Sequence, residues 1–122
     1  MKYNDFRDFP VWQKAYEMVL HIYKLTFTFP IEERYGLTSD MRRAANSIAH
    51  NLAEGYGRYE KKDKTRFYKI ARGSGTELQS QLMVSYGLGY IKDIKVRDET
   101  FDKIGEIIIE INNLIKSVET RP

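Results

Sequence analysis

Apolar residues recur at intervals of three and four residues through almost the whole chain, and this spacing limits the fold more than any other feature. An α-helix has 3.6 residues per turn, so residues at this spacing share one helix face. The length of 122 residues fits one domain spanning residues 1–122. Four such segments joined by short connections predict an all-α protein, an antiparallel up-down four-helix bundle.

Two prolines bound the first predicted helix. Pro10 suits a first helical turn, and Pro30 stops the helix. The core stripe comprises Val11, Ala15, Met18, Ile22, Leu25 and Phe29. An adjacent stripe comprises Trp12, Tyr16, Val19 and Tyr23.

The second helix is predicted from about Met41 to Gly57, after Thr38, Ser39 and Asp40, which are good N-cap residues. Its core stripe comprises Met41, Ala45, Ile48 and Leu52.

The third helix is predicted from near Asp63 to about Tyr90. Its stripe comprises Phe67, Ile70, Ala71, Ser74, Leu78, Leu82, Ser85 and Leu88. Gly73 and Gly75 each disfavour a helix by about 1 kcal/mol, so they need a packing reason.

The last helix is predicted to follow Asp98 as its cap. A seam spaced like a coiled coil comprises Phe101, Ile104, Ile108, Ile111, Ile115 and Val118. Trp12, Tyr16, Tyr23 and Ile107 add apolar surface beyond single core stripes. This excess predicts a homo-oligomer, and the alternative is a wide core stripe in a monomer.

The composition excludes some classes of protein and site. There are no cysteines, so disulfides and thiolate metal sites are excluded. The N-terminal segment MKYNDFRDFP lacks the apolar core of a signal peptide, and no apolar run approaches the ~20 residues of a membrane-spanning helix. A cytoplasmic protein that does not enter a membrane is expected.

Positive charge is concentrated in the middle of the chain. Residues 41–72 carry nine basic and three acidic side chains, although the whole chain has a net charge of only +3. Such a concentration favours a polyanion as partner. The alternative is a solvated helix surface.

The basic residues near position 60 are interleaved with Tyr56, Tyr59, Phe67 and Tyr68. Cations hold phosphates, and exposed aromatic rings stack on unpaired bases. The candidate nucleic-acid-binding residues are Arg42, Arg43, Arg58, Lys61, Lys62, Lys64, Arg66 and Arg72. Alternatively, the aromatic residues belong to the core and the lysines keep the loop soluble. No RNA-recognition motif, helix-turn-helix or zinc finger accompanies them, so sequence-specific reading is unsupported.

A polar stripe follows the second helix at Arg43, Ser47, Asn51, Glu54 and Arg58. Glu77, one turn beyond Ser74 on the third helix, is placed to pair with one of its arginines. We predict that Ser47, Asn51, Glu54 and Glu77 form a structural polar network between the two helices. The alternative is a groove that faces a ligand.

The sequence contains no motif of enzyme chemistry. His21 and His50 lack the cysteine or carboxylate spacing of a metal motif, and the serines have no recognisable base. The Gly-Ser-Gly-Thr string at 73–76 lacks the ending of a phosphate loop. We therefore predict a non-enzymatic protein with no catalytic residue, metal or cofactor.

Several short motifs arrive in the order of a known family. They are Val-Trp-Gln-Lys-Ala at 11–15, Phe-Pro at 29–30, Tyr-Gly-Leu-Thr at 35–38, Arg-Arg-Ala-Ala at 42–45, Ser-Ile at 47–48, Asn51, Ala-Glu-Gly at 53–55, Gly-Arg at 57–58, Gly-Ser at 73–74, Glu77 and Leu-Gly-Tyr at 88–90. Over about residues 6–91 the chain closely resembles the four-helix-bundle proteins encoded by intervening sequences within bacterial 23S ribosomal RNA genes. The final helix resembles the family only in apolar pattern.

The resemblance implies a bacterial, cytoplasmic bundle that commonly forms a homopentamer and is associated with the ribosome or RNA. The related accessory variability determinant proteins form basic pentamers that bind a reverse transcriptase and nucleic acid. The matching positions of interest are Arg42, Arg43, Asn51, Glu54, Arg58 and Glu77. Asp40-Met41 departs from the family, where Gln is more usual, and places an acid beside the basic patch.

Two functions therefore remain open from the sequence. One is a non-catalytic oligomer whose basic surface at residues 41–72 contacts ribosomal or other structured RNA. The other is a protein-interaction scaffold, or an accessory subunit that binds a nucleic-acid enzyme or a ribosomal protein.

Overall fold

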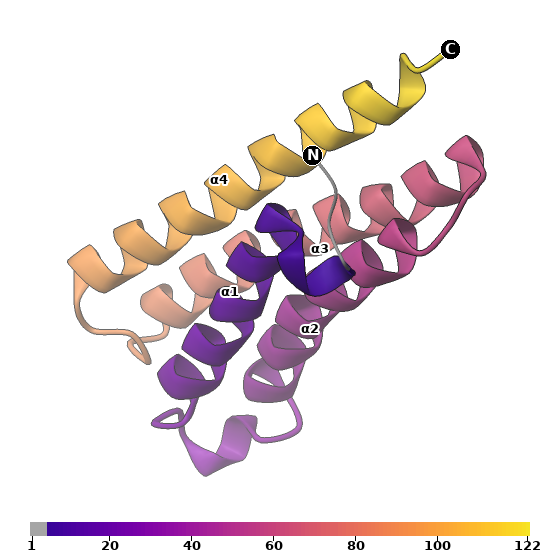
Figure 1. Cartoon of the computed structure of the whole chain (residues 1–122). Coiled ribbons are helices and arrows are strands. Elements are labelled where there is room, and N and C mark those ends of the chain that lie inside the picture. Colours follow the sequence, from indigo (N-terminus) through magenta and orange to yellow (C-terminus); the bar gives the residue numbers. More distant parts are fainter. Residues whose placement is uncertain (1–4) are drawn as a thin grey trace.

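The computed structural model describes residues 5–122, and the regular elements of that range are all helices (Figure 1). The first four residues, part of the segment without a signal-peptide core, lie outside the described range. The elements are η1 (Phe6–Asp8), α1 (Pro10–Thr26), η2 (Ile31–Glu33), α2 (Leu37–Tyr56), α3 (Lys61–Gly87) and α4 (Ile94–Glu119).

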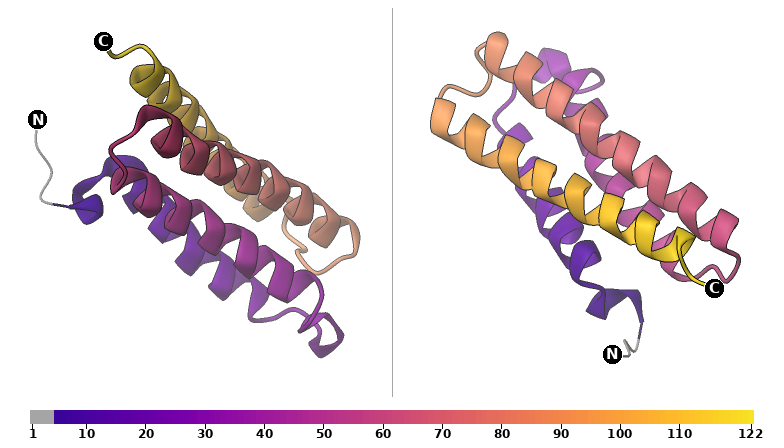
Figure 2. Two further views of the ribbon diagram at one scale, coloured as in Figure 1. Left: turned by 90° about the vertical axis from the view of Figure 1, so that its right-hand side faces the viewer. Right: turned by 90° about the horizontal axis from the view of Figure 1, so that it is seen from above.

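The four α-helices run alternately up and down and pack on their chain neighbours (Figure 2), which confirms the predicted antiparallel bundle. Among neighbouring helices, α2 and α3 have the most extensive contact, and α1 and α4 the smallest. One end of the bundle therefore holds the start of α1, the α2–α3 turn and the end of α4. In the described residues, no helix has an apolar run that could cross a membrane.

The core confirms the stripe predicted on α2 and corrects those on α3 and α4. Side chains without solvent exposure are contributed by all four helices and include Ala15, Ile22, Met41, Ile48, Leu52, Leu78, Leu82, Ile104 and Ile111. Ile70 and Leu88, predicted to be in the α3 core, are exposed, and Tyr68 is buried in their place. On α4, Ile107 is buried although it was predicted to widen the outer surface, and Phe101 lies at the surface.

Three helix starts differ from the prediction. The α2 helix begins four residues early, because the Glu33 carboxylate accepts a hydrogen bond from the Leu37 amide (3.1 Å) and supplies the cap. The α3 helix begins at Lys61, so Asp63 lies within its first turn. Asp93, and not Asp98, caps α4 by accepting from the Lys95 amide at 2.9 Å. Asp98 is instead bonded to Arg97.

A glycine sets the spacing of α2 and α3 near their shared turn. A Cβ atom on Gly55 would lie 2.4 and 2.7 Å from two ring carbons of Tyr68, which is only 2% exposed. Gly75 makes the same kind of approach to α4, where a Cβ would lie 2.9 Å from Ile108. Gly73 has open space around it. Close packing therefore explains a glycine within the helix at position 75 but not at position 73.

These glycines give a paired prediction of stability. Gly55→Ala is expected to destabilise the protein by about 1–2 kcal/mol, because overpacking of roughly 1–3 kcal/mol exceeds the gain of up to about 1 kcal/mol in helix propensity. Gly73→Ala is expected to stabilise it by about 1 kcal/mol, since only the propensity changes. Chemical denaturation measures both, and shifts of the same sign would contradict the close approach of α2 to Tyr68.

Candidate nucleic-acid interface

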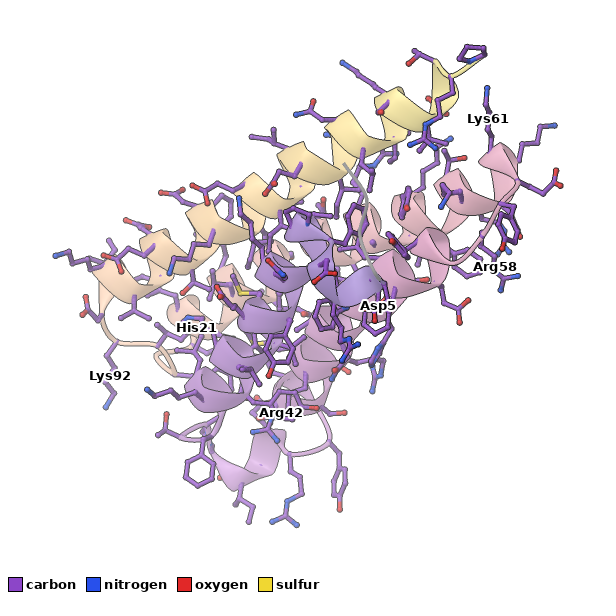
Figure 3. The ribbon with its side chains drawn as sticks, viewed as in Figure 1. Asp5, His21, Arg42, Arg58, Lys61 and Lys92 are labelled. Carbon is purple, nitrogen blue, oxygen red and sulfur yellow. The ribbon has the colours of Figure 1, made fainter. Side chains whose placement is uncertain are left out.

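The α2–α3 turn gathers most of the predicted basic residues at one end of the bundle. Residues 58–72 hold seven basic and two acidic side chains. We call five of these basic residues the basic end: Arg58, Lys61, Lys62, Arg66 and Lys69. All five are exposed. Figure 3 shows Arg58 and Lys61 together at this end.

Lys64 lies in the same segment, but its side chain binds the end of α2 instead of facing solvent. Its ammonium donates to the backbone oxygens of Gly55 (2.7 Å) and Tyr56 (3.0 Å) at the end of α2. It also lies over the Tyr56 and Tyr68 rings. Burial lowers the pKa of this lysine, and the nearby Arg121 lowers it further. A cation at a helix C-terminus is favoured by the helix dipole, so Lys64 acts as a cap for α2.

Three other predicted residues are not part of the basic end. Arg42 and Arg43 lie near the start of α2, roughly 20 Å along the helix from its end. Figure 3 shows this separation for Arg42 and Arg58. Arg72 is half-buried and donates to the Asn112 side chain (2.9 Å), which links α3 to α4. The eight predicted residues therefore do not form one continuous patch.

An open groove of about 660 Å³ crosses the basic end between α3 and the C-terminal part of α4. Lys62, Arg66 and Lys69 line it, and Lys69 pairs with Glu119 across it (3.4 Å). The sequence prediction omitted Lys69. Its spacing from Lys62 and Arg66, seven and three residues, was the signal that places all three on one helix face.

The two arginines of the basic end share one carboxylate. Asp63 accepts from Arg66 at 3.0 Å and lies 3.6 Å from Arg58, which also pairs with Glu54 at 3.1 Å. Both guanidinium groups lie over the Phe67 ring. The arginines are thereby held in place with part of their charge compensated, whereas Lys62 has no ion pair within the described residues.

Of the interleaved aromatic residues, Tyr59 is the most exposed to solvent and Tyr68 is the most deeply buried. The Tyr59 side chain is 99% exposed at the turn. Tyr68 is a core residue, and burial raises its pKa to about 12. Only the exposed ring is free to stack on a base.

The polar stripe joins α2 to α3 through two serines. The Ser74 hydroxyl donates to the Ser47 hydroxyl at 2.7 Å, and Asn51 donates to the Ser47 backbone and side-chain oxygens. Glu77 is exposed and forms no ion pair with an arginine in residues 5–122, because the neighbouring Leu78 takes the core-facing position. The expected link between Glu77 and the stripe is therefore absent from the structure.

Comparison with protein families shows the family of the chain. Residues 7–117 match the family described as 23S rRNA-intervening sequence protein. The chain belongs to this family. The match confirms the resemblance found in the motifs and extends it through most of α4. No curated protein matches the chain.

The chain has two histidines in different surroundings. His21 is half-buried between α1 and α4, with its Nε2 atom 2.9 Å from the Thr100 hydroxyl. Burial lowers the pKa of His21, and Lys103 and Lys24 lower it further. His50 is exposed on α2. Within residues 5–122, no three histidine or carboxylate side chains are grouped to hold a metal ion.

Two lysines of this family member give a paired prediction, in which one substitution lowers stability and the other leaves it nearly unchanged. Lys64→Met is expected to lower the free energy of unfolding by about 1–2 kcal/mol, since two charged hydrogen bonds to the α2 terminus are lost. Lys62→Met is expected to change stability by no more than about 0.5 kcal/mol, because its side chain is exposed. Thermal and urea denaturation distinguish them, and equal losses would refute the capping role of Lys64.

Proposed function

We propose that the chain is a non-catalytic, RNA-associated protein whose basic end contacts the phosphates of structured RNA. The observation that carries the proposal is the gathering of five exposed basic side chains at the α2–α3 turn, in a member of a family named for an intervening sequence of 23S rRNA. Positive charge at this density supplies most of the affinity of sequence-independent nucleic-acid binding.

The contact set proposed from the geometry is narrower than the one predicted from sequence. Lys61, Lys62 and Arg66 are its principal members, because they project from the first turns of α3. Arg58 and Lys69 flank them. Tyr59 adds an exposed ring for an unpaired base at the edge of the paired segment. Arg42, Lys64 and Arg72 are assigned to the fold, since each is half-buried and bonds to another helix or to a helix end.

A binding titration with a structured RNA hairpin at two salt concentrations tests the proposal. Each phosphate contact releases counterions, so the logarithm of the affinity should fall linearly with the logarithm of the salt concentration. Five contacts predict a slope of about −4. Absence of binding at low salt would overturn the proposal, as would an affinity that does not change with salt.

We also propose that the chain assembles with copies of itself, as a homopentamer in line with the family resemblance. Tyr16 and Leu20 lie on one face of α1, Phe27 directly follows the last residue of that helix, and the three are 48, 53 and 82% exposed. An apolar face of this kind on a small bundle favours association. Trp12 is half-buried under Tyr16, and Tyr23 bonds to Asn46, so these two contribute less than the sequence suggested.

Light scattering tests this assembly. The wild-type protein is expected to show a multiple of the 14.4 kDa monomer mass at micromolar concentration. Leu20→Glu should shift the mass toward the monomer, because it places a charge in the apolar face. Ile109→Glu, the same kind of change at an exposed position on α4, is the matched control and should not. A monomeric wild-type protein would contradict the proposal.

The same apolar face favours a second function, a scaffold that binds another protein. In that case the partner should remain bound after nuclease treatment and be released by Leu20→Glu. Loss of the partner on nuclease treatment would instead support RNA as the link.

A further inference from the structure

A second basic surface lies at the opposite end of the bundle from the basic end. An open groove of about 370 Å³ is formed where the end of α1, the loop after η2 and the start of α2 meet. We call it the arginine–tyrosine groove, lined principally by Tyr23, Arg34, Tyr35, Arg42, Arg43 and Asn46. Its lining contains three arginines and no acidic residue. Its volume lies within the range of small-ligand sites.

The floor of the groove is held in place by contacts between α1 and α2. The Arg42 guanidinium donates to the Thr26 hydroxyl at 2.9 Å and lies 4.6 Å from the centre of the Tyr23 ring. Asn46 donates to the Tyr23 hydroxyl at 3.0 Å. These contacts fix Arg42 and Tyr23 as a rigid floor beneath the other lining residues.

The rim of the groove is more open. Tyr35 is 89% exposed, with no hydrogen bond or ring contact in residues 5–122, and the adjacent Arg34 has no ion pair there. Arg43 closes the other side, bonded to Asp40 (2.9 Å) and Ser39 (3.2 Å).

We propose that the arginine–tyrosine groove binds an unpaired nucleotide of RNA, with its base stacked on Tyr35 and its phosphate held by Arg34 and Arg43. Aromatic rings stack on bases only where these are unpaired, and arginine forks match phosphate oxygens. This inference rests on the proposed RNA association and assigns different parts of the RNA to the two sites. The basic end holds the backbone of a paired segment, and the groove binds a single strand that leaves it.

Fluorescence anisotropy with a short, labelled oligouridylate at low salt tests the groove. Tyr35→Ala is expected to weaken binding roughly 5- to 150-fold, the range for loss of one stacked base. Tyr35→Phe keeps the ring and should leave the affinity unchanged. Arg34→Ala should weaken binding about fivefold, from one phosphate contact. Lys92→Ala is the matched control, because it removes an exposed charge near the same end of the bundle without lining the groove (Figure 3).

Binding to a duplex RNA without single-stranded ends tests the basic end independently of the groove. Tyr35→Ala should leave duplex affinity unchanged, whereas alanine at Lys61, Lys62 and Arg66 should lower it. If Tyr35→Ala binds oligouridylate as tightly as wild type, the groove assignment is overturned while the duplex result stands. If the wild type binds neither RNA at low salt, both proposals fail. Displacement by polyglutamate as effective as by unlabelled oligouridylate would show a general anion site and overturn the nucleotide assignment.

Discussion

Replacing Lys61, Lys62 and Arg66 together with alanine is expected to lower the affinity for a structured RNA hairpin roughly a hundredfold at low salt. Each exposed charge near a phosphate contributes about 1 kcal/mol, and three such losses amount to about 3 kcal/mol. The slope of log affinity against log salt should also become less steep by about 3, one for each lost phosphate contact. Filter binding or anisotropy measures both quantities.

The matched control is a triple alanine variant of Lys92, Lys95 and Lys103, which removes the same net charge from exposed positions outside the basic end. Compared with wild type at 0.1 M salt, it should weaken binding less than threefold, because charges more than about 10 Å from the RNA are largely screened at that concentration. Circular dichroism should show both variants folded. Equal losses in the two variants would mean that net charge, and not the basic end, attracts the RNA.

Tyr68→Ala is expected to lower the free energy of unfolding by about 3–5 kcal/mol, the usual cost of removing a large aromatic side chain from a core. The ring is 2% exposed, fits against Gly55, and contacts Phe9 with ring centres 6.4 Å apart. Its loss would leave a cavity in the contact between α2 and α3, the most extensive in the bundle. Urea denaturation with fluorescence detection measures the change.

Tyr59→Ala is the matched control nine residues away, since its side chain is 99% exposed. Its effect on stability should be within about 0.5 kcal/mol. A similar loss of stability in the two variants would contradict the placement of these rings. In RNA binding the order is expected to reverse, with Tyr59→Ala the more damaging among folded variants.

The fold was predictable because its main determinants are local. Spacing alone placed the four helices, and Pro10 begins the first as predicted, but that helix ends at Thr26, four residues before Pro30. Helix starts were less predictable where a cap comes from outside the helix, as when Glu33 accepts from the Leu37 amide. The register of α3 depended on a tertiary fit. The burial of Tyr68 against Gly55 turns Ile70 outward, and periodicity cannot distinguish two adjacent apolar stripes.

The candidate site was predictable as a region but not residue by residue. Charge density identified the α2–α3 turn, yet it cannot separate a lysine that faces solvent from one that caps a helix. Lys62 and Lys64 differ by two positions, which on a helix is more than half a turn. The arginine–tyrosine groove could not be predicted from the sequence, because Arg34 and Tyr35 lie in a loop and only the fold places them beside Arg43.

Photocrosslinking of the wild-type protein to a structured RNA with a single-stranded tail, followed by mass spectrometry, tests the central claim most directly. The account predicts crosslinked peptides that cover residues 58–69, with Tyr59 the principal adduct, because its ring is exposed among the lysines and arginines of the basic end. These crosslinks should disappear at high salt. Crosslinks confined to the outer face of α4, or none at low salt, would contradict RNA contact through the basic end.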